Sequence, residues 1–144
     1  MYERRIIKVW VMEDDDPNKS ILDLLTDFKT ENEINLVVFN DENRLYDQLI
    51  RNETNNNGNT HNMVLFNFDG PLKDIINVIG KIKSHFDLKM IPIFIITSSV
   101  ISSEIFEAYK CYLNCYIVRP DDFEGLIKIL NSFKEFWFNI VRLP

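Results

Sequence analysis

The sequence predicts an α/β fold in which five parallel strands alternate with five helices. Short apolar runs recur along the chain, and stretches with apolar residues at helical spacing separate them. The 144 residues suffice for one core, since 46% are hydrophobic and 12% aromatic. Because parallel strands need crossover connections, the alternation indicates a parallel sheet covered by helices on both faces.

The expected strands are short, and most end at polar or turn-forming residues. They cover residues 6–12, 34–39, 63–68, 93–97 and 115–118. The first runs into an acidic cluster, and the third reaches Asn67, four residues before Pro71. The fourth ends at Thr97, and Arg119 and Pro120 follow the fifth. In an open parallel sheet such residues converge on one crevice, where these folds place their chemistry.

The expected helices lie between the strands, with a last helix after the fifth strand. They cover residues 17–29, 41–51, 72–86, 102–112 and 122–138. Pro17 suits a first helical turn because its missing N–H would be unpaired there. The segment 52–62 is rich in asparagine and lacks apolar residues, so we expect a mobile surface loop. The whole pattern predicts one flavodoxin-like (βα)5 domain over residues 1–144, with strand order 2-1-3-4-5.

Composition argues against several classes of partner. The net charge of −6 and the pI near 4.9 oppose binding to nucleic-acid phosphates. The apolar runs are shorter than the ~20 residues of a membrane span, and the first residues do not form a signal peptide. Cys111 and Cys115 lack nearby histidines, so we expect reduced thiols and no zinc site. We therefore expect a cytoplasmic protein that binds neither nucleic acid nor membrane.

The polar residues at the strand ends resemble those of the response-regulator receiver domain of two-component signalling. Receivers carry an acidic pair after the first strand, an acceptor aspartate followed by proline after the third, Thr or Ser after the fourth, and Lys-Pro after the fifth. The matching positions here are Glu13 and Asp14, Asn67 with Pro71, Thr97, and Arg119 with Pro120. The resemblance covers nearly the whole chain and departs from the pattern at Asn67 and Arg119.

The C-terminal part resembles a narrower group, the single-domain regulators associated with phytochrome-type histidine kinases. The segments that carry this resemblance are 114–123, Phe136-Trp137 and 141–144. It implies a histidine kinase or another signalling protein as partner. It also implies a homodimer built on the fourth helix, the fifth strand and the fifth helix.

Asn67 stands where receivers keep the aspartate that accepts the phosphoryl group. A neutral amide cannot serve as that nucleophile, so we expect no acyl phosphate at this residue. The exchange also removes a negative charge from the presumed Mg²⁺ site, leaving Glu13 and Asp14 as its carboxylates. We therefore expect no required cofactor, weakened Mg²⁺ binding and no enzymatic activity.

Three other pocket positions each allow two interpretations. Arg119 is longer and flatter than lysine, and it either pairs with Asp14 in the metal's place or is solvated beside Pro120. Thr97 either offers its hydroxyl to an anion in the pocket or packs as a β-branched residue. Tyr116 matches the aromatic switch position of receivers, and its alternative is a core or interface residue.

Asp69 is an alternative phosphoryl acceptor. In that register Asn67 would be buried within the strand, and the proline would follow only two residues after the acceptor. Otherwise Asp69 is a loop residue that caps the third helix. In the acidic cluster we assign Asp14, and secondarily Glu13, to the site, and Asp16 to a helix cap.

The last helix has a wider apolar arc than a single sheet contact needs. The stripe expected to face the core consists of Leu126, Ile127, Leu130, Phe133, Trp137, Ile140 and Val141, and Ile129 and Phe136 widen it. We expect a dimer interface that contains Phe106, Tyr109, Ile129, Phe136 and Trp137. The alternative is a tail folded back onto its own domain.

The sequence is compatible with two alternative functions. The preferred one is a non-enzymatic signalling module that recognises its partner without phosphorylation at Asn67. The second is a phosphoryl-accepting receiver that uses Asp69 with Mg²⁺. A flavodoxin-like nucleotide binder is disfavoured, because the chain has four glycines and no Gly-rich phosphate loop.

Overall fold

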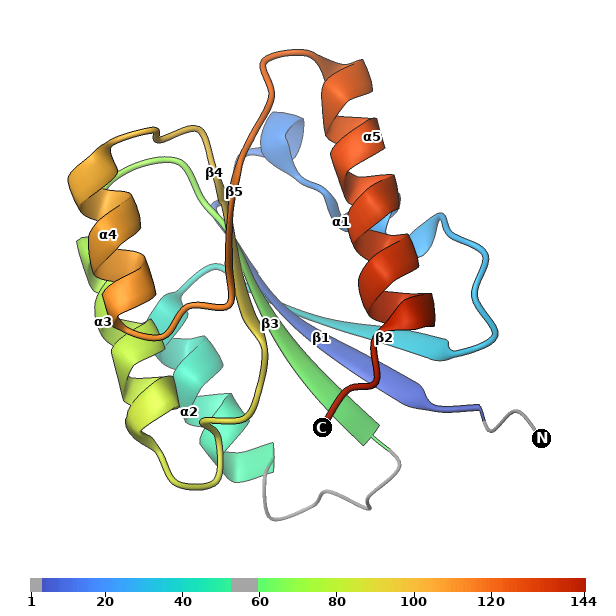
Figure 1. Ribbon diagram of the computed structural model, residues 1–144, viewed down its shortest axis with the longest axis horizontal. Coiled ribbons are helices and arrows are strands. Elements are labelled where there is room, and N and C mark those ends of the chain that lie inside the picture. The colour runs from blue at the N-terminus through green and yellow to red at the C-terminus, as the bar shows by residue number, and fades with distance from the viewer. Residues whose placement is uncertain (1–3, 53–59) are drawn as a thin grey trace.

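The computed structural model describes residues 4–52 and 60–144, which form a five-stranded parallel sheet between two layers of helices (Figure 1). The strand order is β2-β1-β3-β4-β5, so the expected fold class and topology are confirmed. The strands are β1 (Ile6–Glu13), β2 (Glu33–Phe39), β3 (Thr60–Asn67), β4 (Ile93–Thr97) and β5 (Cys115–Val118). No helix within these ranges is long and apolar enough to cross a membrane.

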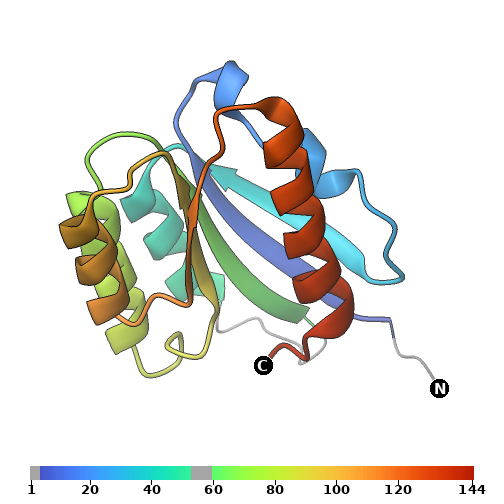
Figure 2. The ribbon, with the colours of Figure 1, turned by 45° about the horizontal axis from the view of Figure 1, so that its top comes forward.

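The helices divide between the two faces of the sheet. They are α1 (Leu22–Thr26), α2 (Glu42–Asn52), α3 (Lys73–Ser84), α4 (Ser102–Lys110) and α5 (Phe123–Lys134). A 3₁₀ turn, η1 (Pro17–Lys19), precedes α1, and a π-helical turn, η3 (Glu135–Ile140), continues α5. Figures 1 and 2 show α2, α3 and α4 on one face and α1 with α5 on the other.

Alternate residues of the central strands feed two separate cores. Val64, Phe66 and Ile95 are fully buried in the layer under α2, α3 and α4. Leu65 and Phe94 are fully buried in the layer under α1 and α5. This period of two follows from the pleat, and burial on both faces explains why the third and fourth strands read as continuous apolar runs.

The expected helix over residues 17–29 is wrong, because the chain breaks between η1 and α1. Ser20 adopts an extended conformation. The Ser20 hydroxyl and the Ile21 N–H both donate to the Glu13 carboxylate, which draws this segment toward the end of β1. Asp16 caps η1 by accepting from the Asn18 N–H, 3.0 Å away, so its capping role is confirmed.

The expected stripe of the last helix includes Leu126, Leu130, Phe133, Trp137 and Val141, which pack in or against the core, but it is wrong at Ile140. Phe138 is fully buried, whereas Ile140 is 63% exposed. A π-helical turn holds more residues than an α-helical turn, so side chains beyond residue 134 rotate to new directions. Ile140 is therefore an error of the expected stripe, and Phe138 takes the place in the core.

The asparagine-rich segment is only partly a loop. Thr60 to Asn62 belong to β3 and pair with Ile6 to Lys8 of β1. Asn62 also accepts a hydrogen bond from the Trp10 indole, at 3.0 Å. Asn52 is the last residue of α2, and residues 53–59 of the expected loop lie outside the described residues.

The two cysteines flank the turn between α4 and β5. Neither Cys111 nor Cys115 forms a disulfide. Burial raises the pKa of the Cys115 thiol above its ordinary value, which favours the protonated form.

Candidate functional site

The carboxyl ends of four adjacent strands bring most of the expected site residues together. Glu13 of β1 lies beside Asn67 of β3 in the strand register, and Thr97 of β4 lies beside Val118 of β5. Arg119 follows directly after β5, and its N–H donates to the Thr97 carbonyl over 2.7 Å. The order of the sheet thus assembles one cluster from residues far apart in sequence.

Asn67 is held by Glu13 and is nearly inaccessible. Its Nδ2 donates to Glu13 Oε2 over 2.7 Å and to the Lys19 carbonyl over 2.9 Å. Asn67 is 2% exposed and Glu13 is 6% exposed. The Glu13 carboxylate also accepts from the Ser20 hydroxyl and the Ile21 N–H, so three groups satisfy its charge.

Arg119 contacts Asn67 on the side opposite to Glu13. Its Nη2 donates to Asn67 Oδ1, and its Nη1 donates to the Lys19 carbonyl over 3.2 Å. Its Nε lies 3.7 Å from Asp69 Oδ2. The side chain is only 9% exposed, so Arg119 neither pairs with Asp14 nor is solvated, and both expected arrangements are wrong.

The Asp69 carboxylate is surrounded by hydrogen-bond donors and by two cationic side chains. Its Oδ1 accepts from the Ser98 N–H at 2.7 Å and from the Thr97 hydroxyl at 3.4 Å. Its Oδ2 lies 3.5 Å from Lys19 Nζ and 3.7 Å from Arg119 Nε. Burial alone would raise the pKa of Asp69, but the Ser98 N–H, Arg119 and Lys19 outweigh burial and lower it.

The alternative role expected for Asp69, capping of the third helix, is wrong. The N-cap of α3 is Leu72, which offers no side-chain hydrogen bond. The Asp69 carboxylate instead turns toward β4 and β5. Asp69 therefore belongs to the site.

Asp14 lies apart from the Asn67–Arg119 network. With Asp15 and Asp16 it lines a separate hollow beside Asn40 and Arg44. Within the described residues, no hydrogen bond or ion pair joins Asp14 to Asn67, Asp69 or Arg119. Glu13 lines this hollow as well, so the two acidic residues remain neighbours, but only Glu13 is hydrogen-bonded to Asn67.

The donor set does not fit a divalent cation at the Glu13–Asn67 edge. Glu13 is committed to three hydrogen-bond donors, and Asn67 turns its amide nitrogen, which cannot ligate a metal, toward Glu13. The Asn67 oxygen faces the Arg119 guanidinium. Among the described residues, no group of three His, Cys, Asp or Glu side chains is placed to hold a metal ion. Lys19 and Arg119 lie against Asp69, whereas three uncharged donors satisfy Glu13.

The remaining pocket residues connect this network to α4 and β5. Thr97 is fully buried and contacts Asp69 through its hydroxyl. The half-buried Tyr116 donates its hydroxyl to the Ser99 carbonyl over 2.9 Å, and its N–H donates to the Tyr109 hydroxyl over 2.9 Å. Pro120 packs near Gly125 at the start of α5. These contacts place Thr97 and Tyr116 along one path from the site to the surface of α4.

Three residues of the site were not predicted from the sequence. Lys19 supplies two contacts through its carbonyl and one through its ammonium, Ser20 holds Glu13, and Ser98 supplies the N–H that binds Asp69. Backbone carbonyl and N–H contacts leave no side-chain signal in a sequence. Only the position of Ser98 directly after Thr97 could have indicated its role.

The residues expected at an interface belong to α4, α5 and η3. Phe106 is 65% exposed, and Tyr109 and Phe136 are also exposed. Ile129 is partly buried. Trp137 packs against Phe94, with 4.7 Å between the ring centroids, so its ring belongs largely to the core.

Comparison with known proteins finds similarity to response regulators. No protein-family model matches the chain. The response regulator Rcp1 of Synechocystis sp. is 31% identical over 83 residues, which are 58% of this chain and 56% of Rcp1. The match therefore spans little more than half the length of that relative.

Solved structures extend the similarity over the whole chain. The phosphorylated cyanobacterial phytochrome response regulator RcpA is 26% identical, with 99% of both chains covered and a TM-score of 0.76. The Mn²⁺-bound form of Rcp1 shares the fold at 22% identity, with 95% of this chain and 98% of that chain covered and a TM-score of 0.73. The expected resemblance is thus confirmed: the chain is a homologue of phytochrome response regulators and has the fold of a single-domain receiver.

Proposed function

We propose that this receiver acts in two-component signalling through protein contacts alone, without accepting a phosphoryl group at residue 67. One observation carries the proposal. The Asn67 amide is buried, uncharged and bonded at both ends, to Glu13 through Nδ2 and to Arg119 through Oδ1. No enzymatic activity and no cofactor are part of the proposed role.

The chemistry of phosphoryl transfer requires groups that this site has committed elsewhere. An acceptor needs a charged oxygen, and Mg²⁺ normally neutralises the phosphoryl oxygens. Here Asn67 has no full charge, and the Arg119 guanidinium lies against its oxygen. A cation already compensates the pocket, so Mg²⁺ binding by Glu13 and Asp14 is weak and not required.

Asp69 supplies an internal anion in the same pocket. A hydroxyl, a backbone N–H and two cations surround its carboxylate, a set of groups that would equally suit a phosphoryl oxygen. The internal carboxylate therefore holds Thr97 and the start of the β4–α4 connection in one arrangement. In this proposal the chain itself, and not phosphorylation, sets the conformation of the β4–α4 connection.

The proposed contact surface flanks the β5 edge of the sheet. Its exposed apolar side chains are Phe106, Tyr109, Tyr112, Val118 and Phe136. Aromatic residues gathered on one exposed face are typical of protein interfaces. We propose that this surface forms a homodimer and that a histidine kinase or another cytoplasmic signalling protein is the partner.

Sedimentation velocity and thermal unfolding, with and without Mg²⁺ and beryllofluoride, test the proposal. We expect the oligomeric state and the melting temperature of the parent to stay unchanged. The double variant Asn67→Asp with Arg119→Lys restores the receiver pattern and serves as the responsive control. A parent protein that dimerises only with beryllofluoride and Mg²⁺ would overturn the proposal.

The second candidate function is phosphoryl acceptance by Asp69. The surroundings of the Asp69 carboxylate favour this function. The carboxylate is ionised, partly accessible and close to Lys19 and Arg119, which would stabilise an incoming phosphoryl group. Peptide mapping after incubation with acetyl phosphate and Mg²⁺ distinguishes the two. A label on the peptide that contains Asp69, abolished in Asp69→Asn, would establish this candidate.

A further inference from the structure

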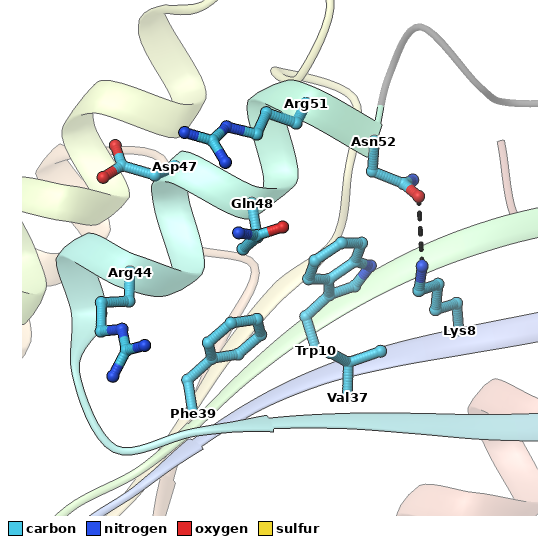
Figure 3. Close-up of a pocket in the computed structure, with 9 residues that line it drawn as sticks. All are labelled: Lys8, Trp10, Val37, Phe39, Arg44, Asp47, Gln48, Arg51 and Asn52. Atoms are coloured by element: carbon cyan, nitrogen blue, oxygen red, sulfur yellow. Dashed lines mark hydrogen bonds between the residues drawn. The ribbon is translucent and has the colours of Figure 1, made fainter.

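A hollow of ≈ 510 Å³ lies between α2 and the strands β1 and β2, away from the carboxyl-end site. Figure 3 shows the Trp10 and Phe39 rings rising from the strands toward α2, with Lys8 at one end and Arg44 at the other. The other lining residues are Val37, Asp47, Gln48, Arg51 and Asn52. Its volume falls within the range of small-ligand pockets in proteins.

The two rings form the floor of the hollow. Trp10 and Phe39 are stacked, with 6.1 Å between their centroids and 5° between their planes. The Trp10 indole N–H donates to Asn62 over 3.0 Å, which fixes the ring. Trp10 is nearly inaccessible, whereas Phe39 is partly exposed, so a planar ligand group would rest mainly on Phe39 and Val37.

Lys8 is an unusual residue for its position. It lies within β1, which has strands on both sides, and on the face that α2 covers. Its ammonium donates to Asn52 Oδ1 over 3.1 Å and lies 4.5 Å from the Trp10 ring centroid. Neither neighbour carries a negative charge, so the charge of Lys8 is left uncompensated beside the hollow.

Arg44 is the second cation of the hollow, and it also borders the neighbouring hollow that Asp14, Asp15 and Asp16 line. Its guanidinium has no hydrogen-bond or ion-pair partner within the described residues. Three basic side chains and a single carboxylate, Asp47, line the hollow, although the whole chain carries a net charge of −6. A positive hollow in an acidic protein attracts anions.

We propose that this hollow binds a small anion that carries a planar ring, of the mononucleotide class. The ring packs on Phe39 and Val37 below α2, and the anionic group pairs with Arg44, with Lys8 at the opposite end. Side-chain cations replace the Gly-rich phosphate loop that the sequence lacks. This site is independent of Asn67 and of the signalling role proposed above.

The two tryptophan indoles make the test direct, because NMR resolves one signal for each. Trp10 lies in the hollow, whereas Trp137 packs in the core on the opposite face of the sheet. Titration with AMP, GMP, CMP and UMP is expected to shift the Trp10 signal for at least one nucleotide and to leave Trp137 unchanged. Trp137→Phe assigns the two signals.

Matched probes and variants identify the groups responsible. Adenosine and inorganic phosphate, which each supply half of the ligand, are expected to bind at least about tenfold more weakly than the best nucleotide. Arg44→Gln should weaken binding about tenfold, and Asp47→Asn should tighten it. Lys128→Gln, an equal charge change on exposed α5, should have no effect.

Several outcomes would overturn the proposal. One is a Trp10 signal that no nucleotide moves at millimolar concentration. Another is inorganic phosphate that binds as tightly as the nucleotides, which would exclude the ring. A third is equal weakening by Arg44→Gln and Lys128→Gln, which would indicate adventitious attraction to surface charge. Circular dichroism verifies that each variant is folded.

Discussion

At the scale of single residues, the amide of Asn67 determines what its charged neighbours do. A carboxylate at this position would face Glu13 across 2.7 Å, and two buried anions at that distance repel strongly. The amide removes the repulsion by presenting a donor to Glu13 and an acceptor to Arg119. The planar guanidinium then reaches the Lys19 carbonyl and Asp69 as well, a set of contacts that a lysine cannot reproduce.

Asn67→Asp should therefore destabilise the protein in the absence of metal, by roughly 2 kcal/mol or more, because one oxygen of the new carboxylate would replace the donor to the buried Glu13 carboxylate and repel it, and Arg119 at the other oxygen offsets only part of this cost. Mg²⁺ should recover part of this loss, so the melting temperature of the variant should rise with Mg²⁺ while that of the parent does not. Adding Arg119→Lys should increase Mg²⁺ affinity further and permit some phosphoryl uptake. If the double variant binds Mg²⁺ no better than the parent, position 67 is not the acceptor position.

Asp69 should make stability depend on pH in the acid range. Its pKa in the folded protein lies below the ordinary 3.8, so its stabilising contribution is complete above that pH. As the pH falls through the lower folded value, the carboxylate takes up a proton and the contribution is lost. Urea unfolding of the parent and of Asp69→Asn should show a difference in the free energy of unfolding that shrinks between pH ~4 and pH ~2. Asp121→Asn, at an exposed position, is the control. A difference that stays constant across this range would show that Asp69 forms no such contacts.

At the scale of elements, the end of α5 shows how polar contacts override an apolar pattern. The π-helical turn η3 leaves the Phe138 carbonyl free of the helix, and the buried Asn32 donates to it over 2.7 Å. Asn32 Oδ1 also accepts from the Arg5 N–H, so one amide ties η3 to the segment that precedes β1. The turn places Phe138 in the core and Ile140 in solvent.

Replacement of Asn32 by leucine should destabilise the protein by about 2 kcal/mol, because the Phe138 carbonyl and the Arg5 N–H lose their partner. Chemical denaturation with fluorescence detection measures the change. Asn139→Ala, which removes an exposed amide from the same turn, should cost much less. Equal effects of the two substitutions would show that the buried amide does not hold η3.

The strands and the positions of Asn67, Thr97 and Arg119 could be predicted, because apolar runs and strand ends leave a direct signal in the sequence. The contacts of Arg119 could not. Its choice of Asp69 over Asp14 depends on the break between η1 and α1, which places the Lys19 carbonyl beside it. That break depends in turn on hydrogen bonds from Ser20 and Ile21 to Glu13, which only the assembled sheet brings together.

At the scale of the whole molecule, the apolar surface that flanks β5 remains without a partner in a single chain. Figure 1 places α4 and α5 on opposite faces of the sheet with β5 at the edge between them. Exposed aromatic residues lie on both sides of this edge, Phe106 and Tyr109 in α4 and Phe136 in η3, which continues α5. The proposed homodimer covers this edge, and hydrophobic contact, not phosphorylation, stabilises it.

Phe136→Glu should give a folded monomer, because it places an unpaired charge in the proposed interface at a side chain that is 49% exposed in the single chain. Truncation of a large interfacial side chain can cost about 2 kcal/mol or more, which exceeds a tenfold loss of affinity. Sedimentation velocity measures the mass, and circular dichroism measures folding. Glu124→Gln, at an exposed position near the start of α5, is the control. A parent that is monomeric at high concentration, or a variant that unfolds, would show that the aromatic residues serve the chain's own core.

We propose above that the Asn67–Arg119 network takes the place of phosphoryl chemistry in this protein. The most direct measurement is the intact mass of the parent after incubation with acetyl phosphate and Mg²⁺, beside the Asn67→Asp, Arg119→Lys double variant. We expect an unchanged mass for the parent and a fraction of the double variant heavier by one phosphoryl group. A parent that gains one phosphoryl group would contradict it.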